Sequence, residues 1–339
     1  MTHGVSVVAA VITPVNSAIT AHQPLQPDTR VLLSQRRPGK HLAGSWEFPG
    51  GRVEPDETEF VALQRELKEE LGITVHAAER WCTLTHRYPE KTVSLKIYRV
   101  TDWSGVASGL EGQAIEWVPW HAVPDRPMPP ADRALLKLFG MAPCYLMDQA
   151  PDHGRTFDAL LQDWQARLAA ITKSPWSNER WLVQWTGPCG DESDQAIALG
   201  RAAIVSAQRA GHVCLVGGSE AWARYLGADG VVFSKASGMV LTERPRALSW
   251  AAMACDDPAS LQQATALGLD FVLLSPLRAT KAQPMDPALG GGAFEALVQQ
   301  AGLPVIAVGG LGVDDLTWVR SLGGFGVASR AHWPAVGDA

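Results

Sequence analysis

The sequence lacks the features of a membrane protein, of a disulfide-stapled secreted domain and of a nucleic-acid-binding protein. Its five cysteines have no close pair, which argues against a zinc ribbon, a CxxC redox site or a disulfide framework; they are Cys82, Cys144, Cys189, Cys214 and Cys255. No run of about 18 apolar residues is present to span a membrane, and the start, MTHGVSVVAAVITP, has no basic region typical of a signal peptide. A net charge of -6 and a pI near 5.9 argue against a nucleic-acid polymer as partner. We therefore expect a cytoplasmic protein with no membrane partner.

The length predicts two domains, because 339 residues exceed the roughly 100 to 200 of one ordinary domain. Hydrophobic residues make up 46% and charged residues 19%, the composition of a globular chain. In the first part, strands are predicted at 5–13, 30–35, 92–100 and 115–118, and a helix at 130–140, which begins with Pro and ends with Gly. These elements indicate an α+β domain over residues 1–141.

After residue 141, short apolar runs alternate with segments of helical spacing. There are eight such runs: CYLM, WLVQW, VCLV, GVVFS, SWAAMA, FVLLS, PVIAV and FGVAS. The segments between them, such as DQAIALGRAAIVSAQRAG, have Gly near the C-terminal end. This alternation predicts a (β/α)8 TIM barrel over residues 142–339, with its active face at the C-terminal ends of the strands.

The stretch GRVEPDETEFVALQRELKEELGI, beginning at Gly51, concentrates carboxylates on one predicted helix that starts at Asp56. Its expected buried stripe recurs every three or four residues and consists of Phe60, Leu63, Leu67 and Leu71. Glu66, Glu69 and Glu70 are related by i, i+3 and i+4 and converge on one arc beside the stripe. A salt-bridged surface helix is one interpretation. The other is a site for a hard cation such as Mg²⁺ or Mn²⁺, which removes the repulsion among the carboxylates.

This stretch resembles the Nudix box, G-x5-E-x7-R-E-U-x-E-E-x-G-U with U aliphatic. Every fixed position is filled, by Gly51, Glu57, Arg65, Glu66, Leu67, Glu69, Glu70, Gly72 and Ile73. The resemblance covers about residues 5–140 and is to the MutT branch, which hydrolyses nucleoside triphosphates to the monophosphate and pyrophosphate. It implies an α/β/α Nudix sandwich, Mg²⁺ with Mn²⁺ as an alternative, and a nucleoside triphosphate substrate. Oxidised purine dNTPs such as 8-oxo-dGTP are candidates.

The resemblance also implies a role for individual residues. The metal ligands would be the Gly50 carbonyl, Glu66, Glu69, Glu70 and, in EGQAIEW, Glu111. Glu57 and Arg65 would orient the helix and its carboxylates. One carboxylate would take the proton of the attacking water, and the sequence leaves open which one.

The substrate-binding residues implied by the resemblance lie on both sides of the box. In RRPGKHLAGSWEFPGG, Arg36 and His41 belong to a basic loop that complements a triphosphate. Phe48 stands where the family has an aromatic near the base, and it could equally belong to the core. Lys91 replaces a family Arg, which keeps the charge but loses the planar fork.

Asp132 departs from the relatives that act on 8-oxo-dGTP, because PPAD stands here where they have PPAN. Asn can donate to O6 and accept from N7–H of 8-oxoguanine, whereas an ionised Asp can only accept. Protonation would restore both roles, and burial could achieve this by raising the pKa of Asp132. The sequence thus defines the class of reaction better than it defines the preferred nucleobase of the substrate.

The second half, about residues 142–335, resembles thiamine monophosphate synthase and its TenI relatives through LVQW, YLGADGVVF, LGLDFVLLSP, LPVIAVGGL and FGVAS. The resemblance implies a phosphate site at four residues after the seventh and eighth strands: Gly309, Gly310, Ala328 and Ser329. Glycines there could instead relieve crowding at the strand ends. Positions that are catalytic in the family are replaced here, by Thr186, Pro188, Gly218 and Asp256.

Three interpretations follow. The first is a nucleoside triphosphate pyrophosphohydrolase whose barrel is not catalytic and holds a phosphorylated small ligand. The second makes the chain a thiamine-phosphate transferase, against which the missing basic residues of the barrel argue. The third treats the barrel as a sensor or scaffold for a phosphorylated ligand.

Overall fold

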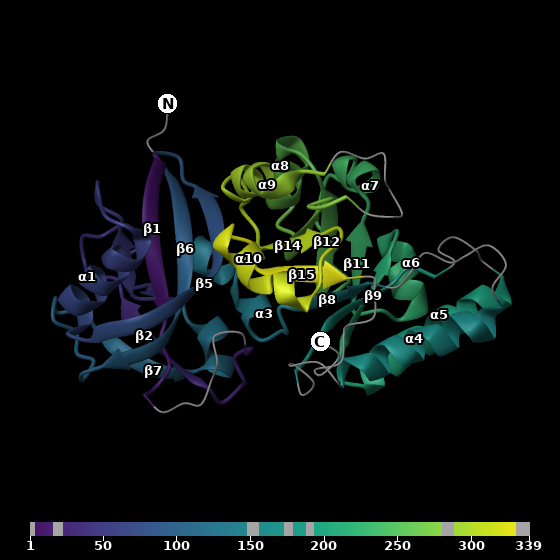
Figure 1. Ribbon diagram of the computed structural model, residues 1–339, viewed down its shortest axis with the longest axis horizontal. Coiled ribbons are helices and arrows are strands. Elements are labelled where there is room, and N and C mark those ends of the chain that lie inside the picture. Colours follow the sequence, from purple (N-terminus) through teal and green to yellow (C-terminus); the bar gives the residue numbers. More distant parts are fainter. Residues whose placement is uncertain are drawn as a thin grey trace. The chain divides into compact units, whose positions relative to one another are not determined.

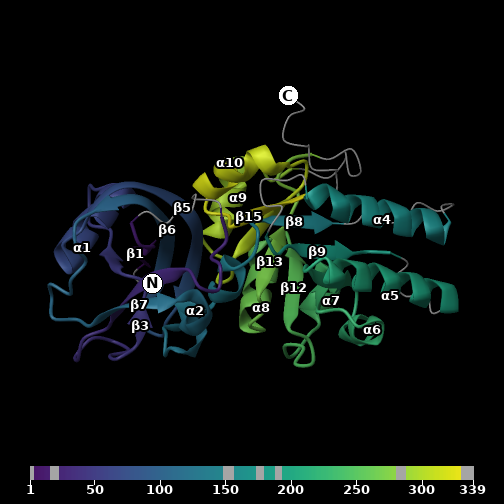
Figure 2. The same cartoon turned by 90° about the horizontal axis from the view of Figure 1, so that it is seen from below.

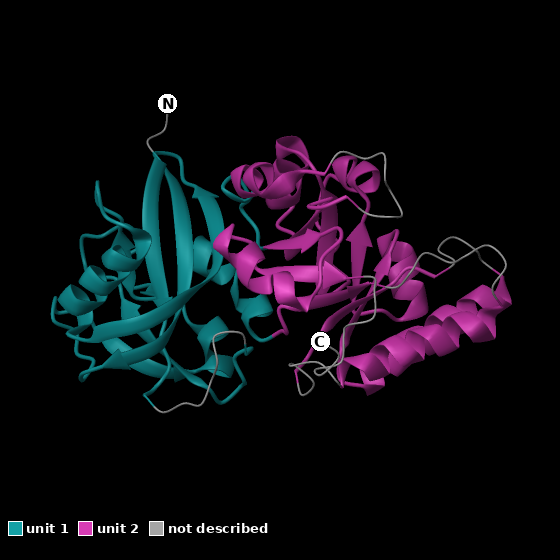
Figure 3. Ribbon diagram, in the orientation of Figure 1, with its two compact units in different colours: residues 1–140, 298–304 teal, residues 141–297, 305–339 magenta. Residues whose placement is uncertain are grey.

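The computed structural model describes residues 4–15, 23–147, 156–172, 179–187, 193–279 and 288–329. The chain divides into two compact units, residues 1–140 with 298–304 and residues 141–297 with 305–339 (Figure 3). Within the described ranges, no helix is long and apolar enough to cross a membrane.

The first unit contains two sheets (Figure 1). The larger has the order β4-β1-β6-β5, in which β1 and β6 are parallel and the outer pairs are antiparallel. Its strands are β1 (Gly4–Val11), β4 (Gly50–Arg52), β5 (Thr74–Arg87) and β6 (Thr92–Ser104). The smaller, antiparallel sheet β3-β2-β7 consists of β2 (Arg30–Gln35), β3 (Trp46–Glu47) and β7 (Ile115–Pro119).

The acidic stretch forms helix α1 (Glu59–Leu71), which begins three residues later than predicted. The backbone of Asp56 has φ of 69°, a left-handed conformation that a right-handed helix cannot include. The Thr58 side chain then accepts a hydrogen bond from the backbone N–H of Val61 and caps the helix. At the other end Gly72, with φ of 74°, stops it.

The apolar stripe of α1 packs into the core of the first unit. Leu63, Leu67 and Leu71 are fully buried and cluster with Val8 of β1, whereas the predicted stripe member Phe60 is only partly buried. This packing fixes the rotation of α1 about its axis. The rotation in turn determines which carboxylates face β4 and which face solvent.

This unit differs from the sequence-based prediction at residues 120–140 and at strands β3, β4 and β5, which were not predicted. The segment 130–140 forms two short helices, α2 (Pro130–Arg133) and α3 (Leu136–Phe139), because the N–H of Leu135 bonds to Asp132 three residues back and tightens the chain there. A 3-10 helix, η1 (Trp120–Asp125), precedes them. Strand β5 was missed because its register shifts between Val75 and Cys82 interrupt the alternation of buried and exposed residues.

The second unit is a closed barrel of eight parallel strands in the order β10-β11-β12-β13-β14-β15-β8-β9. All eight apolar runs form its strands, which confirms the predicted barrel. The strands are β8 (Cys144–Met147), β9 (Leu182–Trp185), β10 (Val213–Gly217), β11 (Gly230–Phe233), β12 (Trp250–Cys255), β13 (Phe271–Leu274), β14 (Val305–Val308) and β15 (Gly326–Ser329).

Helices follow the barrel strands and cover them from outside, with α4 and α5 side by side (Figures 1 and 2). They are α4 (Phe157–Ile171), α5 (Asp194–Arg209), α6 (Glu220–Leu226), α7 (Lys235–Met239), α8 (Pro258–Ala266), α9 (Gly290–Val298), η2 (Val313–Asp315) and α10 (Leu316–Ser321). Several begin with a side-chain cap from the preceding loop, namely Thr156, Ser193, Ser219, Ser234 and Asp257.

Candidate active site

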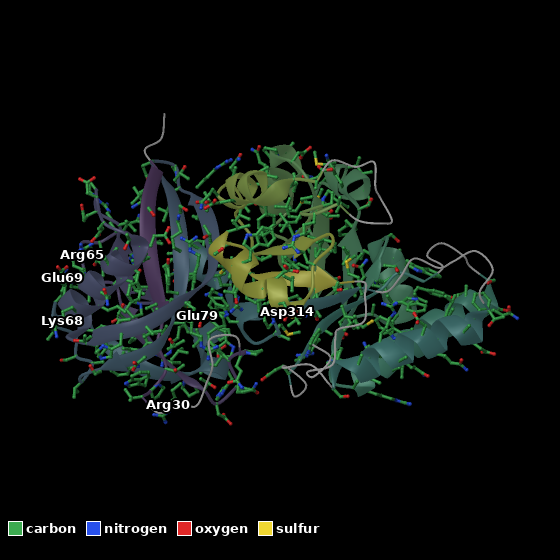
Figure 4. All side chains as sticks on the ribbon, viewed as in Figure 1. Arg30, Arg65, Lys68, Glu69, Glu79 and Asp314 are labelled. Atoms are coloured by element: carbon green, nitrogen blue, oxygen red, sulfur yellow. The ribbon has the colours of Figure 1, made fainter. Side chains whose placement is uncertain are left out.

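Arg65 on α1 joins three carboxylates, and Figure 4 labels it beside Glu69 on the same helix. Its guanidinium donates to both oxygens of Glu57, at 2.6 and 3.2 Å, to Glu66 at 2.9 Å and to Glu69 at 3.4 Å. It also donates to the carbonyl of Arg52 at 2.9 Å. Because the planar fork of Arg can serve several oxygens at fixed angles, Arg65 holds the end of β4, the loop before α1 and the acidic face in one arrangement.

Two glycines at the start of β4 let that strand approach the acidic face. Gly50 has φ of 149°, and a Cβ there would lie 2.1 Å from the carbonyl oxygen of Val8. A Cβ at Gly51 would lie 2.1 Å from the carboxyl carbon of Glu66. The backbone N–H of Gly50 donates to the carboxylate of Glu70 at 3.3 Å. The pair of glycines therefore forms a cradle for two carboxylates of α1.

Glu70 is largely buried among other carboxyl groups. Burial, followed by the charges of Glu47, Glu66 and Glu111, raises the pKa of Glu70 to about 8, against the opposing effect of the Gly50 N–H. All of these side chains offer hard oxygen atoms, the donors that Mg²⁺ and Mn²⁺ prefer. Together with the room that Gly51 leaves for Glu66, this donor set fits a divalent cation.

As the side chains stand, no three His, Cys, Asp or Glu groups converge on one point within the described ranges. Arg65 binds the carboxylates of Glu66 and Glu69, and the Glu69 side chain is 56% exposed. The carboxylate of Glu111 is bound by Arg37 at 2.7 Å. Each of these three carboxylates thus has an arginine partner with which a cation would compete.

A cleft of about 660 Å³ in the first unit brings most of the predicted site residues together. Those that line it are Arg36, His41, Phe48, Gly50, Glu66, Glu70, Lys91, Glu111 and Asp132. The cleft does not include Glu57, Arg65 or Glu69 in its lining. Glu57 and Arg65 are joined to the wall of the cleft through the contact of Arg65 with Glu66, and Glu69 is bound to the same guanidinium.

The basic loop faces the acidic wall across the cleft. Arg36 forms an ion pair with Glu47, and its Nε donates to the carbonyl of His41 at 2.7 Å. Arg37 donates to both the carbonyl and the carboxylate of Glu111, at 2.7 Å each. The guanidinium groups are thus aligned by acceptors on β3 and on the loops that border the cleft, a geometry suited to a bound polyanion.

The apolar end of the cleft contains Phe48 and Asp132. Phe48 is 3% exposed and packs against Phe139 at 6.1 Å between ring centroids, so it belongs to the core and lines the cleft at once. Asp132 is 6% exposed and accepts a 3.5 Å hydrogen bond from the backbone N–H of Phe48. Burial, followed by the charge of Glu47, raises the pKa of Asp132 to about 7. Lys91 lies 6.0 Å from the ring centroid of Tyr88.

Glu47 and Tyr88 line the cleft and were missed in the sequence. Glu47 lies near both Glu70 and Asp132, since its charge acts on the pKa of each. Burial raises its own pKa, and Arg36 opposes this. Its position next to Phe48, in a strand that leads into the glycine cradle, was the available signal. For Tyr88 the only signal was its nearness in sequence to Lys91.

In the barrel, Gly309 and Gly310 follow β14 with φ of 113° and 62°. A Cβ at Gly309 would lie 3.0 Å from the backbone nitrogen of Leu277, so close backbone approach already requires glycine there. Ala328 and Ser329 were expected after the eighth strand, but they form the end of β15 itself and are buried.

The positions predicted from the sequence to replace catalytic residues are spread around the barrel. Thr186 follows β9, Gly218 follows β10, and Asp256 follows β12. Asp256 forms an ion pair with Lys235, which also bonds to Asp257 at 2.7 Å. Pro188 lies outside the described residues.

Comparisons with known proteins match different relatives to the two halves of the chain. Residues 24–138 match the NUDIX domain family, and residues 190–332 match the thiamine monophosphate synthase family. The chain is 42% identical over 107 residues to the 8-oxo-dGTP diphosphatase of Haemophilus influenzae, which covers 32% of this chain and 79% of that protein. It is 37% identical over 115 residues to the CTP pyrophosphohydrolase of Escherichia coli, covering 34% and 85%. Thiamine phosphate pyrophosphorylase from Pyrococcus furiosus aligns with a TM-score of 0.40 at 13% identity, covering 55% of this chain and 84% of that one.

The glycine cradle makes a prediction that separates folding from metal binding. Gly51→Ala meets only the flexible end of Glu66, so we expect a nearly unchanged thermal midpoint and at least tenfold weaker Mn²⁺ binding, a loss of about 1.4 kcal/mol. Gly50→Ala meets backbone in a conformation that Ala rarely adopts, so its thermal midpoint should fall by several degrees. Thermal scans and Mn²⁺ titration followed by electron paramagnetic resonance would measure both. Wild-type Mn²⁺ affinity in Gly51→Ala would contradict the cradle.

Proposed function

Since the chain belongs to the Nudix hydrolases through its N-terminal domain, which precedes a barrel of the thiamine monophosphate synthase and TenI type, we propose that it hydrolyses nucleoside triphosphates to the monophosphate and pyrophosphate. Oxidised purine dNTPs such as 8-oxo-dGTP are the proposed substrates, and residues 1–141 the domain responsible. The observation that carries this proposal is the single cleft in which an acidic wall, a basic loop and an apolar end meet.

The proposed roles follow from position in the cleft. Arg36 and His41 face the triphosphate, with Lys91 near the base, and the Arg65 network keeps α1 in register with β4. The proposed ligands of Mg²⁺ or Mn²⁺ are the Gly50 carbonyl, Glu66, Glu69, Glu70 and Glu111. Such a cation neutralises phosphate charge and lowers the pKa of a bound water. The wall that holds it is rigid, because Leu63, Leu67 and Leu71 are fully buried beneath it.

The first functional prediction concerns Glu70. Glu70→Gln keeps the size of the side chain but removes one charge from an electrostatically dominated site, so kcat should fall by at least about a hundredfold. A panel including 8-oxo-dGTP, 8-oxo-dATP, dGTP and CTP, with pyrophosphate and orthophosphate release measured separately, would test it. Glu79→Gln, which changes an exposed carboxylate of β5, serves as the matched control and should retain wild-type rates.

Undiminished turnover of Glu70→Gln at saturating Mg²⁺ would show that α1 does not carry the reaction. Orthophosphate release by the wild type, in place of pyrophosphate, would contradict the proposed position of cleavage.

Asp132 is proposed to set base preference, in a pH-dependent manner. Below its raised pKa of about 7 the carboxyl is neutral and can donate and accept, as Asn does in the relatives; above it the carboxylate only accepts. The neutral form matches 8-oxoguanine. The ionised form matches a base that presents donors at both N6 and N7–H, such as 8-oxoadenine.

We therefore expect the ratio of kcat/KM for 8-oxo-dGTP over 8-oxo-dATP to fall as pH rises through about 7, by roughly tenfold, because one unpaired buried polar group costs about 1–3 kcal/mol. Asp132→Asn should raise this ratio and make it independent of pH between about 6 and 8. Steady-state kinetics with both nucleotides at each pH would measure it. If the two proteins show the same ratio at every pH, Asp132 has no part in base recognition.

For the barrel we propose phosphate binding without thiamine phosphate synthesis. Transfer onto a thiazole phosphate requires cations or metal at the leaving diphosphate, and Thr186 and Gly218 supply neither. Backbone N–H groups at Gly310, after β14, and at Ser329, the last residue of β15, need no side-chain charge to hold a phosphate.

The full chain, incubated with hydroxymethylpyrimidine diphosphate, thiazole phosphate and Mg²⁺, should form no thiamine monophosphate above a no-enzyme control. Calorimetric titration with thiazole phosphate should show binding at or below millimolar concentration. This binding should persist in Glu70→Gln and be lost in Gly310→Asp, which places a negative charge at the phosphate. Turnover would refute the first statement, and no heat of binding would refute the second.

A further inference from the structure

The segment between β6 and β7, residues 105–114, caps the C-terminal end of α1. The N–H of Ser108 donates to the carbonyl of Leu71 at 3.0 Å, and the N–H of Leu110 donates to the carbonyl of Glu70 at 2.9 Å. These carbonyls belong to the last turn of the helix, where no intrahelical donor remains. The loop that carries Glu111 is thus attached to the helix that carries Glu70.

The side chain of Gln113 forms the second attachment. Its Nε2 donates to the carbonyl of Glu70 at 2.9 Å, and its Oε1 accepts from the backbone N–H of Glu111 at 2.9 Å. The two partners fix the orientation of the Gln113 amide, since the carbonyl of Glu70 needs a donor and the N–H of Glu111 needs an acceptor. One half-buried side chain therefore connects the backbones of two acidic residues on different elements.

Apart from Gln113, the backbone of Glu111 is held by Arg37, which donates to its carbonyl at 2.7 Å. Glu111 is exposed and lies in a turn in which the N–H of Gly112 bonds to the carbonyl of Gly109 at 3.2 Å. Gly112 has φ of 80°, and a Cβ at Gly109 would lie 2.0 Å from the carbonyl oxygen of Gln113. A glycine-rich turn of this kind loses much conformational entropy when ordered, so its geometry depends on the bonds that hold it.

Arg37 holds Glu111 in a different way from Gln113. Arg37 contacts the Glu111 carboxylate as well as its carbonyl, so it competes with anything else that the carboxylate binds. Gln113 contacts only the backbone N–H of Glu111 and leaves both carboxylate oxygens available. The Gln113 bridge can therefore stay intact while the carboxylate changes partner.

We propose that Gln113 is a positioning residue that sets the Glu111 carboxylate beside Glu70 for binding of the divalent cation. This inference rests on the proposed function, which makes Glu70 and Glu111 ligands. Groups that orient ligands from outside the coordination shell commonly change metal affinity by 10–100-fold when they are removed. Gln113 does not contact the carboxylate of Glu111, and it acts through the backbone N–H of that residue.

The test is Gln113→Leu in the full chain, without nucleotide. The substitution keeps similar size and removes both hydrogen bonds, so Mn²⁺ should bind about tenfold more weakly, as measured by electron paramagnetic resonance of free Mn²⁺. Hydrogen exchange of the peptide that covers residues 105–114 should become faster, because the N–H of Glu111 loses its acceptor. Gln113→Met, unbranched and also unable to form the bridge, should behave in the same way.

Gln64→Leu is the matched control. Gln64 also lies on the first unit and donates from Nε2 to a backbone carbonyl, that of Val75 at 2.8 Å, away from Glu111. Its loss should leave Mn²⁺ affinity unchanged. In a Glu111→Gln background, which should itself bind Mn²⁺ more weakly, adding Gln113→Leu should cause no further loss, because the two residues act through one ligand.

The possible results separate the positioning role of Gln113 from the assignment of Glu111 as a metal ligand. Wild-type Mn²⁺ affinity in Gln113→Leu and Gln113→Met, together with weakened binding in Glu111→Gln, would overturn the positioning role. An additive loss in the double variant would overturn it as well, since Gln113 would then act independently of Glu111. Unchanged binding in Glu111→Gln would instead contradict the ligand assignment in the proposed function.

Discussion

The arrangement of the first unit depends on α1, where the free energy gained by burying leucines opposes the repulsion among neighbouring carboxylates. Like charges at i, i+4 cost an exposed helix about 0.2–0.5 kcal/mol per pair, whereas a fully buried Leu contributes about 1.5–3 kcal/mol. Leu63, Leu67 and Leu71 are all fully buried, so the apolar stripe outweighs the repulsion and sets the rotation of the helix. Arg65 then neutralises part of the charge of the acidic face. The glycine cradle leaves room for the carboxylates of Glu66 and Glu70.

The sequence predicted what depends on spacing along one element. The eight barrel strands and the residues of α1 follow from apolar periodicity and from a motif that fixes many positions, and both were found as expected. The start of α1 was misplaced because the left-handed backbone at Asp56 is a property of conformation rather than of composition. Strand β5 was missed because its bulges interrupt the very alternation by which strands are recognised.

Contacts between distant segments were harder to predict. Glu47 acts on both Glu70 and Asp132 only in the folded chain, and its position next to Phe48 was the one signal in the sequence. Burial of Asp132, which raises its pKa to about 7, likewise requires the walls of the cleft to be known. The side chains of Gln113 and Arg37 meet Glu111 through loop geometry. A single sequence contains no periodic signal for such contacts.

The two units differ in what their sites require. The cleft of the first unit is lined by many charged side chains, such as Asp132 and Lys91, whose residue types can be read directly in the sequence. A phosphate site in the barrel would be built from backbone N–H groups. Because every residue except proline has one, the residue types in the sequence do not reveal such a site. Gly309 illustrates the difference, because its φ of 113° and its approach to Leu277 require glycine whether or not a ligand binds. The motifs of the barrel therefore define a fold, whereas those of the first unit define a chemistry.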